Sequence, residues 1–550
     1  MKKNFLLRQL LAAVLLAGLA VGCRTLETLQ PVPGGLSAAQ PPAPVDVIVP
    51  DPAQHLQVLL TLRHGHPCVA TAAHRLQTAP LAARQALSRS AFHQRYQASR
   101  ADVALVEKFA LEYVLRLQKV DHAQRVVELD GTVAALEKAF GVIIKQYGQG
   151  RQRHLSATGT VHLPARLQKV VTSVQGLHNL PLTSSAVVER VARVRPTRQS
   201  AYNGYSGAQM AKLYHFPANT TGKGQCIGLV ELNGGYSQAD LQQYFQLTNG
   251  GPVPEVVNIQ VAAVDTPATG FKETSLDLQV AASAAPGARY AVYFGQNTKS
   301  GFLQALKAAV HDSINQPSVI SISWGSPELY WSAQEMAGFE EVLQDAALLN
   351  VTIILSTGDL GSTCGVRDGG QHVQFPASSP YALAIGGTSV TVRADTINNE
   401  VVWSNFFAQT GGGFSTAYTS RPAFQQPVVP DTVKSWTVSR GIPDASFHAD
   451  NYAGYLLVVN GQPTTDGGTS AAAPLCAALI ARLNEALGVH LGYVTPLLYD
   501  AQCRGAFRPT TQGSNGGYYS ARSPWNPCTG LGSADGERLL RCLRSMGIHR

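Results

Sequence analysis

Charged side chains are scarce in this sequence of 550 residues. Asp, Glu, Lys and Arg make up 14% of the chain, whereas about 25% is typical of soluble proteins. This low charge density, with 45% hydrophobic residues and 51 glycines, argues against an intrinsically disordered chain, because disorder requires few apolar and many charged residues. The composition suits a folded, secreted α/β protein, and the length predicts two or three domains.

Long hydrophobic runs are missing beyond the first residues. Lys2 and Lys3 precede an uncharged apolar stretch from Leu10 to Val21, which is too short to cross a bilayer as a stable helix. We therefore interpret residues 1–23 as a signal peptide. The segment that ends at Cys23 resembles a bacterial lipoprotein box, except that Ala20 stands where leucine is usual.

The leader predicts where the protein resides. Cys23 is the expected lipid acceptor, and the Pro-rich residues 24–50 would form a flexible linker between the membrane and the folded part. We expect an exported protein that is held in the bacterial cell envelope as a lipid-anchored precursor, or is extracellular after maturation, or both.

A concentrated basic surface is also lacking. The net charge is +8, but the basic residues are dispersed and do not alternate with aromatic residues, so nucleic acid is excluded as a partner. A local excess of arginines in residues 186–200 is interpreted as an exposed connector between two domains, open to proteolytic processing. These arginines are Arg190, Arg193, Arg195 and Arg198.

No two cysteines have the spacing of a zinc site. Eight cysteines are present, and Cys503, Cys528 and Cys542 lie close together near the end of the chain. A disulfide bond among these three fits an exported protein, but the sequence does not choose the pair. Cys476 lies in an apolar segment and is predicted to fill the core.

The most informative segment is Gly467 to Pro474, which places a serine among small residues at the start of an apolar helix. Ser470 could act as a nucleophile there if a base lies close enough to take its proton. The small neighbours would leave room for a substrate backbone. The alternative is a helix amino terminus capped by Thr469 or Ser470, and the segment alone does not decide between the two.

An acidic pair, Glu273 and Asp277, supplies a candidate base. Residues four apart on a helix share one face, and Leu276 and Val280 predict that this helix is buried. Two buried carboxyls resist double ionisation, so one pKa rises. Glu273 could then take the proton of Ser470, with Asp277 orienting it. Acids that merely stabilise a helix amino terminus are the alternative.

A third acid, Asp359, follows the apolar run Val351 to Leu355. The carboxyl end of a buried strand is where α/β enzymes place chemistry. A protonated Asp359 could donate a hydrogen bond to a developing oxyanion. Ordinary turn chemistry after a strand is the alternative interpretation.

Taken together, these segments resemble the sedolisin family of serine-carboxyl peptidases. The matching motifs are Glu273-x-x-Leu276-Asp277, Ser356-x-Gly358-Asp359 and Gly468-Thr469-Ser470-x-x-x-Pro474. The resemblance implies a subtilisin-like fold in which glutamate replaces the histidine base. It makes Ser470 the nucleophile, Glu273 the general base, Asp277 its orienting partner and Asp359 the oxyanion donor.

Two further segments match the same family, Ile227 to Tyr236 and Ser321 to Gly325. The resemblance implies that Glu231 and Trp324 extend the hydrogen-bond network behind the base. A strand-end acid and a core aromatic residue are the simpler interpretation of these two.

The amino-terminal half resembles the activation prodomain of the family, in Val127 to Gly141, Val161 to Pro164 and Val174 to Leu177. We therefore expect a prodomain over residues 51–185, of α+β and ferredoxin-like type, and a peptidase domain over residues 201–550. The fold class is α/β, with a doubly wound parallel sheet in the peptidase domain.

The pattern of apolar runs agrees with a parallel sheet whose strands alternate with helices. Helices are expected at 301–312 and 332–349. Strands are expected at Cys226 to Leu232, Tyr290 to Phe294, Val319 to Trp324 and Val351 to Ser356.

One family feature is altered. Relatives carry a calcium site near the carboxyl terminus that uses two Asp carboxylates, and the matching positions here hold Pro509 and Asn526. Calcium prefers six to eight oxygen ligands that include carboxylates, so we expect no calcium and no other cofactor.

The resemblance predicts a peptidase that is made as an inactive precursor, cuts polypeptides at acidic pH as an endopeptidase and is inhibited by its own prodomain. We expect a monomer. The sequence leaves substrate preference and tripeptidyl-peptidase activity open. A subtilisin with a histidine base is less favoured because no His-Gly-Thr motif occurs, and His64 and His66 are interpreted as solvated loop histidines. A non-catalytic surface lipoprotein that uses the fold for binding is the alternative from another class.

Overall fold

The computed structural model describes residues 29–31, 47–79, 84, 86–148, 153–182, 204–262, 268–429 and 438–549. The predicted signal peptide, the lipid acceptor Cys23, most of the 24–50 linker and the arginine-rich connector at 186–200 lie outside these residues. Within the described part, every helix is too short or too polar to pass through a membrane.

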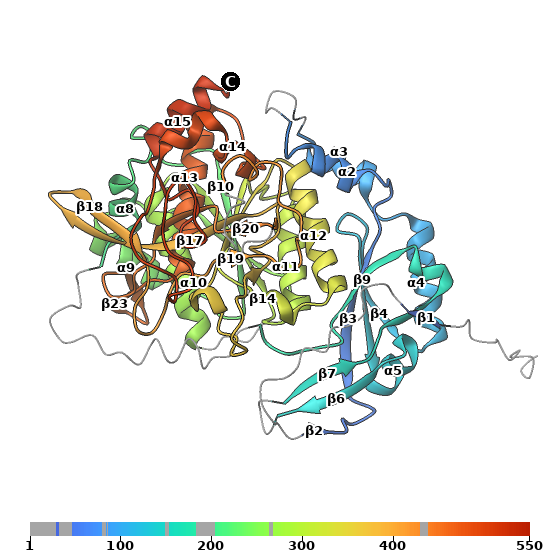
Figure 1. Cartoon of the computed structure of the whole chain (residues 1–550). Helices are drawn as coiled ribbons and strands as arrows, with labels where there is room; N and C mark the ends of the chain where they lie inside the picture. Colours follow the sequence, from blue (N-terminus) through green and yellow to red (C-terminus); the bar gives the residue numbers. More distant parts are fainter. Residues whose placement is uncertain are drawn as a thin grey trace, which may run out of the picture.

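The amino-terminal domain is α+β, as expected. Its main sheet is antiparallel, in the order β4-β5-β3-β9, and the helices α4 (Arg100–Glu112) and α5 (Val133–Phe140) lie against it (Figure 1). The four strands are β3 (His55–Leu62), β4 (Arg116–Asp121), β5 (Val126–Thr132) and β9 (Val171–Gln175). Leu60, Phe109 and Leu129 belong to a hydrophobic core formed by this domain alone.

Shorter elements complete this domain. A second sheet has the order β2-β6-β7, and β1 pairs with β8. The elements are β1 (Leu29–Pro31), β2 (Val47–Ile48), α2 (Val69–Arg75), α3 (Arg89–Tyr96), β6 (Ile143–Tyr147), β7 (His154–Thr158), β8 (His162–Pro164) and α6 (Ala165–Gln168).

The carboxyl-terminal domain is built on one large sheet in the order β11-β12-β10-β13-β15-β17-β18, with β21 also paired to β17. All neighbours are parallel except β17 and β18. The strands are β10 (Cys226–Leu232), β11 (Val256–Gln260), β12 (Arg289–Gly295), β13 (Val319–Ile322), β15 (Thr352–Ser356), β17 (Leu383–Arg393), β18 (Thr396–Val402) and β21 (Ala445–His448). The predicted parallel sheet is confirmed.

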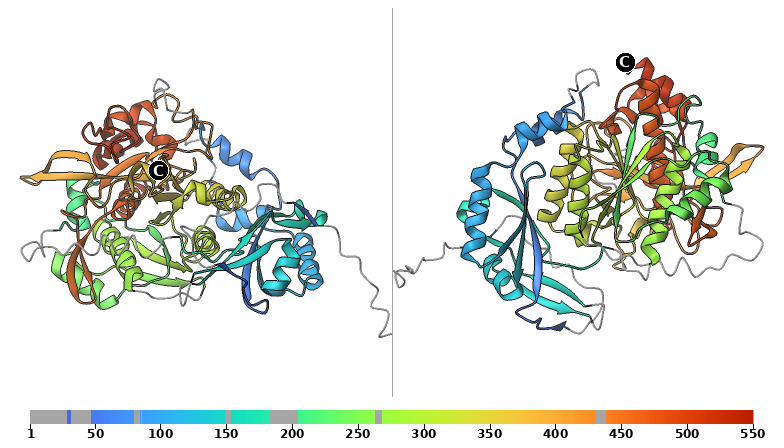
Figure 2. Two further views of the ribbon diagram at one scale, coloured as in Figure 1. Left: turned by 60° about the horizontal axis from the view of Figure 1, so that its bottom comes forward. Right: turned by 180° about the vertical axis from the view of Figure 1, so that it is seen from behind.

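Helices cover both faces of this sheet, so it is doubly wound. The helices α10 (Ala268–Ala284) and α13 (Thr469–Leu487) pack together on one face, and α11 (Lys299–His311) and α12 (Ala333–Leu348) lie on the other (Figures 1 and 2). The predicted helices at 301–312 and 332–349 correspond to α11 and α12. The second of these begins at a capping box, in which Ser332 and Glu335 satisfy each other's backbone N–H groups.

Smaller elements lie around this framework. They are α8 (Gly207–Leu213), α9 (Gln238–Thr248), β14 (Ser326–Pro327), η3 (Glu328–Tyr330), η4 (Gly361–Thr363), β16 (Gln374–Phe375), β19 (Gly413–Phe414), β20 (Gly441–Ile442), β22 (Tyr455–Val459), β23 (Gln462–Asp466), α14 (Thr495–Leu498), η5 (Ala501–Ala506), β24 (Phe507–Arg508), β25 (Ser533–Ala534) and α15 (Gly536–Ser545).

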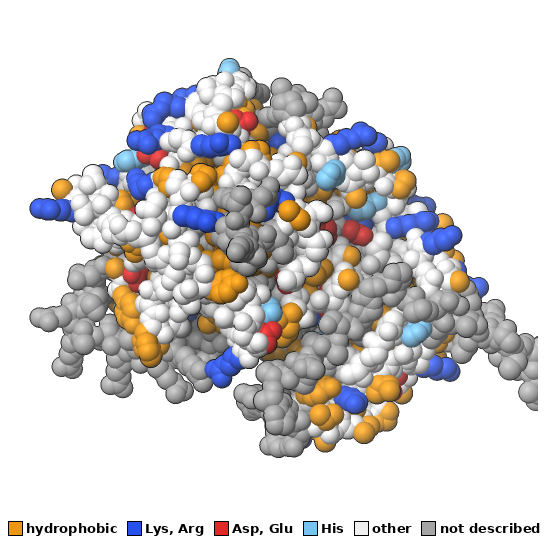
Figure 3. Space-filling view, in the orientation of Figure 1, with side chains coloured by type: hydrophobic (Ala, Val, Ile, Leu, Met, Phe, Trp, Pro, Cys, Tyr) orange, Lys and Arg blue, Asp and Glu red, His pale blue; other side chains and the backbone are white. Residues whose placement is uncertain are grey.

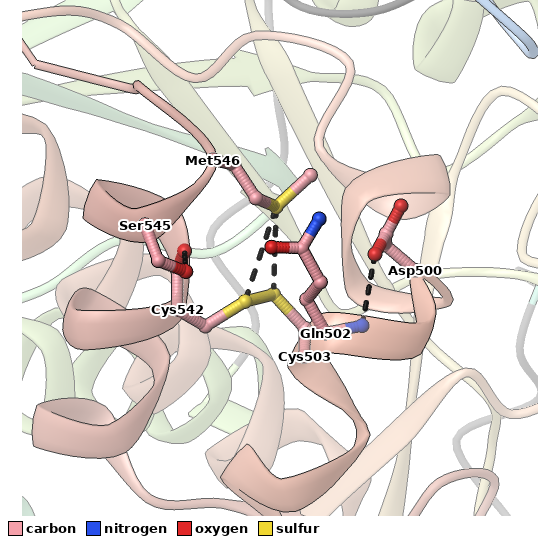
Figure 4. The surroundings of a disulfide bond; sticks show 6 residues. All are labelled: Asp500, Gln502, Cys503, Cys542, Ser545 and Met546. Carbon is pink, nitrogen blue, oxygen red and sulfur yellow. Dashed lines mark hydrogen bonds between the residues drawn. A yellow bond between two sulfur atoms is a disulfide. The ribbon is translucent and has the colours of Figure 1, made fainter.

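A disulfide bond ties the carboxyl terminus to the domain. Cys503 at η5 is bonded to Cys542 on α15, and the sulfur of Met546 lies against both (Figure 4). The structure thus selects one of the three possible pairs. Cys528 is a free, buried thiol, and Cys476 is buried in the core as predicted.

The amino-terminal domain lies against α11 and α12, on the face of the sheet opposite α10 and α13 (Figures 1 and 2). Figure 3 shows basic side chains spread over both domains on the visible face. The interface corrects one prediction. His64 is not a solvated loop histidine, because its side chain is 11% exposed and its Nε2 lies 2.7 Å from Oδ1 of Asp345 on α12. His66 is exposed as expected.

Candidate active site

The predicted site residues meet where the carboxyl ends of the central strands approach the amino terminus of α13. Glu231 lies near the end of β10, Trp324 follows β13 by two residues and Asp359 follows β15 by three. Parallel strands bring these positions to one edge of the sheet, which is where α/β folds place ligands. The helix α10 packs beside α13 and carries the acidic pair.

Ser470 is the second residue of α13, and its side chain is only partly buried. The preceding turn depends on Gly468, whose φ is 98°. A Cβ at this glycine would lie 2.5 Å from Oδ2 of Asp359. Both the backbone conformation and the space therefore favour glycine, and this turn sets the serine hydroxyl at the helix entrance.

The Ser470 side chain lies beside the Glu273 carboxyl, where it acts to lower the pKa of that carboxyl. Burial raises the pKa of Glu273 to about 7, and the negative charges of Asp466 and Asp359 act in the same direction. The Ser470 side chain and the positive charge of Lys272 act against that rise in the pKa. A carboxyl with a pKa near 7 is a stronger proton acceptor than an ordinary glutamate.

Asp277 lies behind Glu273 and is fully buried. Ser323 donates a hydrogen bond from Oγ to Oδ2 of Asp277 over 2.6 Å. Burial raises the pKa of Asp277 well above its usual range, and the negative charges of Glu231 and Glu273 raise it further. Ser323 was not among the residues selected from the sequence, although it lies within the Ser321 to Gly325 segment.

Glu231 is also fully buried and lies close to Asp277 and Glu273. Its Oε2 accepts long hydrogen bonds from Trp324 Nε1 and Thr274 Oγ1, both at 3.4 Å. Burial and the charge of Glu273 raise the pKa of Glu231 well above normal. Trp324 therefore lies where the prediction placed it, behind the acidic residues.

The three carboxyls of Glu231, Glu273 and Asp277 form a buried acidic cluster. Each has one oxygen that meets no hydrogen-bond donor among the described residues. A buried carboxyl oxygen without a donor is costly, and neighbouring buried carboxyls avoid the cost by sharing protons. The cluster is thus suited to accept and return one proton as a unit.

Asp359 faces the same turn from the other side. Its Oδ1 accepts hydrogen bonds from the backbone N–H of Thr469 at 2.9 Å and from the Thr469 hydroxyl at 2.7 Å. Burial raises the pKa of Asp359, and the charge of Asp466 adds to the effect. Because Oδ1 already accepts two bonds, a proton on this group belongs on Oδ2, the oxygen beside Gly468.

Sequence reasoning also missed an ion pair at the edge of the site. Lys272 Nζ lies 2.5 Å from Oδ2 of Asp466. These residues immediately precede Glu273 and the Gly467-Gly468 turn, so proximity to the motifs was the available signal. Both charges act on the candidate base.

A side-chain amide joins the two altered segments near the carboxyl terminus. Asn526 donates from Nδ2 to the carbonyl oxygens of Arg522 at 2.9 Å and Thr510 at 3.4 Å. Its Oδ1 accepts from the backbone N–H groups of Cys528 and Thr529. The Asn526 amide thus occupies, as a hydrogen-bond donor, carbonyl oxygens that could otherwise serve as calcium ligands. In the described ranges, no three His, Cys, Asp or Glu side chains gather as metal ligands.

Comparison with known proteins identifies the family of both domains. Residues 45–180 match the pro-kumamolisin activation domain, and residues 260–496 match the subtilase family. Kumamolisin from Bacillus sp. (strain MN-32) is 38% identical over 540 residues, covering 94% of this chain and 97% of that protein. Sedolisin from Pseudomonas sp. (strain 101) is 30% identical over 454 residues, covering 77% of this chain and 76% of that protein.

A solved structure supports the same fold. Pseudomonas sedolisin, a serine-carboxyl proteinase complexed with two molecules of pseudo-iodotyrostatin, superposes with a TM-score of 0.57 at 30% identity. The match covers 62% of this chain and 98% of that structure.

Proposed function

Because this chain belongs to the sedolisin family and is a serine-type peptidase made with an activation prodomain, we propose that Ser470, Glu273 and Asp277 form its catalytic triad. The observation that carries the proposal is the position of the Ser470 side chain beside the Glu273 carboxyl, whose pKa it acts to lower. In the first step Glu273 accepts the hydroxyl proton, and Ser470 Oγ attacks the peptide carbonyl carbon. Asp277 orients Glu273 and shares the added proton.

The developing oxyanion needs a donor on the opposite side of Ser470. We assign this role to Asp359, whose Oδ2 carries the proton while Oδ1 is held by Thr469. A neutral carboxylic acid donates a strong hydrogen bond to an oxyanion. When the tetrahedral intermediate collapses, Glu273 returns its proton to the leaving amine and an acyl-Ser470 ester remains. Water attacks that ester with Glu273 again as the base.

The two protonation requirements set a limited pH range. Glu273 has to be ionised to take the proton, and Asp359 has to be protonated to donate. Burial raises both pKa values in the precursor. We propose activity at acidic pH, where Asp359 keeps its proton and the ionised fraction of Glu273 takes the proton of Ser470.

The remaining assignments follow from the leader and the altered segments. We propose export by the signal peptide, lipid attachment at Cys23, a monomeric enzyme and polypeptide substrates cut internally. We also propose that no calcium binds at Pro509 and Asn526, because the Asn526 amide joins the two segments directly.

The proposal is tested by incubating the purified precursor across acidic pH and sequencing the products, with a Ser470→Ala precursor as control. Internal cuts by the parent and none by the variant support it. Equal processing by both precursors would show that Ser470 is not the nucleophile. If the only products are released tripeptides, the enzyme is a tripeptidyl-peptidase and not an endopeptidase.

A further inference from the structure

A group of ionisable side chains lies between the prodomain and the helices α11 and α12, on the face of the sheet opposite α10 and α13 (Figure 1). We name it the interface cluster. Its members are His64, His93 and Arg125 from the prodomain, and Lys307, His311, Glu341 and Asp345 from the peptidase domain.

Asp345 is the anionic centre of the interface cluster, with no exposed surface. Its Oδ1 lies 2.7 Å from His64 Nε2, and its Oδ2 accepts a 2.8 Å bond from the Arg125 guanidinium. Arg125 is itself completely buried, and also donates to Glu341 at 2.8 Å. Arg125 and His64 hold the pKa of Asp345 well below its usual range. The prodomain thus supplies two partners, His64 and Arg125, of a buried peptidase-domain carboxylate.

A histidine pair lies beside this centre. His93 Nε2 of α3 is 3.2 Å from His311 Nδ1 of α11, and the Phe92 ring lies 5.7 Å from the His311 ring. His311 Nε2 is 3.3 Å from Asp345 Oδ2. A hydrogen bond between two imidazoles needs one N–H and one bare nitrogen. The contact therefore survives one added proton but not two, because two imidazolium rings would direct N–H groups at each other.

Burial and two positive neighbours oppose added positive charge at the histidine pair, although Asp345 partly offsets them. Lys307 is fully buried, donates to the Gln124 carbonyl and lies close to Arg125. Burial together with Lys307 and Arg125 lowers the pKa of His311 to about 4, although Asp345 opposes the shift. Burial and the charge of Arg89 lower the pKa of His93, with Asp121 and Asp345 opposing.

We propose that the His93–His311 pair is the acid sensor that releases the prodomain. This inference rests on the proposed zymogen function, and names residues for its regulation. Protonation of both rings would break their contact and place excess positive charge beside Lys307 and Arg125. The prodomain would then separate from α11 and α12, and the histidines would be solvated.

The direction of the pH dependence follows from linkage. A solvated histidine ionises near a pKa of about 6.5, whereas His311 in the closed precursor ionises at about 4. The open form binds protons more readily, so the closed form is fully favoured above about pH 6.5 and loses stability as the pH falls towards about 4. Asp345 acts in a different pH range, because its pKa is lowered in the closed precursor. It stabilises the closed form above the normal Asp pKa of about 3.9, and this stabilisation is lost only below that pH.

The test uses the full-length Ser470→Ala precursor, so opening is measured without any catalysis. Amide hydrogen exchange in α11 and α12 is followed from neutral to acidic pH, and each variant is compared with its parent at the same pH so that intrinsic exchange cancels. We expect opening of the parent between about pH 6.5 and 4. His311→Gln, which cannot titrate, should open less at about pH 5, on the order of tenfold.

His93→Gln provides a second variant from the other domain and should shift opening to lower pH in the same way. His55→Gln is the matched control, because His55 is an exposed prodomain histidine paired only with Asp130. If both interface variants open at the parent's pH, or if His55→Gln shifts opening equally, the histidine pair is not the sensor. Since Ser470 is absent throughout, that result would leave the catalytic proposal untouched.

Discussion

Lys272 and Asp466 form an ion pair of 2.5 Å directly beside the candidate base. The pair joins the helix that carries Glu273 to the strand that leads into the Gly467-Gly468 turn. The two charges have opposite effects on the pKa of Glu273, which Lys272 lowers and Asp466 raises. This arrangement makes the pH dependence of the enzyme sensitive to either residue.

Removing one charge at a time should therefore shift the pH profile in opposite directions. Lys272→Met raises the pKa of Glu273, so the acidic limb of kcat/KM moves to higher pH, because more of the base stays protonated. Asp466→Asn lowers the pKa of Glu273 and that of Asp359, so both limbs move to lower pH. We expect shifts of about half a pH unit, since nearby partly exposed charges are screened by solvent.

Lys212→Met serves as the control, since Lys212 is an exposed residue that pairs only with exposed Asp395. If Lys272→Met and Asp466→Asn shift the pH profile in the same direction, their charges do not control the pKa of Glu273 as described. A loss of activity in both variants would not change that conclusion.

Ser323 is predicted to position Asp277. Ser323→Ala removes the hydroxyl that donates to Asp277 Oδ2, so ionisation of Asp277 becomes still less favourable and Glu273 loses a fixed partner. We expect kcat to fall by about tenfold, the cost of leaving a buried carboxyl without its hydrogen-bond partner, with KM unchanged. Ser323→Thr keeps the hydroxyl and should recover most of the rate. A rise in KM with kcat unchanged would place Ser323 in substrate binding instead.

Asn526 is predicted to replace a metal ion as the link between the two carboxyl-terminal segments. A chelator should leave the melting temperature of the wild-type protein unchanged. Asn526→Asp exchanges the donating amide for a carboxylate that faces the carbonyls of Arg522 and Thr510. We expect a loss of about 2 kcal/mol in the free energy of unfolding, measured in chelator by denaturant titration.

The control is Asn399→Asp on the exposed part of β18, which should change stability little. Stoichiometric calcium in purified wild-type protein, or a lower melting temperature in chelator, would overturn this prediction.

The sequence predicted the acidic and serine motifs because each is a short local pattern. Glu273 and Asp277 are one helical turn apart, and Thr469 and Ser470 open a helix. The strands β10, β12, β13 and β15 were also predicted, since their buried apolar runs are continuous. The fold class and family are confirmed by the comparisons.

What the sequence missed lies in contacts between distant segments. His64 was interpreted as solvated because its loop is polar, but Asp345, 281 residues away, buries it. Lys272 and Asp466 are 194 positions apart, and their pairing depends on how α10 and β23 come together. The choice of Cys503 and Cys542 similarly needed the position of α15 beside η5. The leader, Cys23 and the connector stay predictions.

The central claim is that a carboxylate takes the proton of Ser470, and Glu273→Gln tests it most directly. The amide is nearly the same size and keeps a hydrogen-bonding oxygen, but it cannot accept a proton at any working pH. After incubation of the purified precursor in acid, we predict no self-processing and a loss of peptide hydrolysis on the order of 10⁴-fold. Either activity at the wild-type rate would show that Glu273 is not the base.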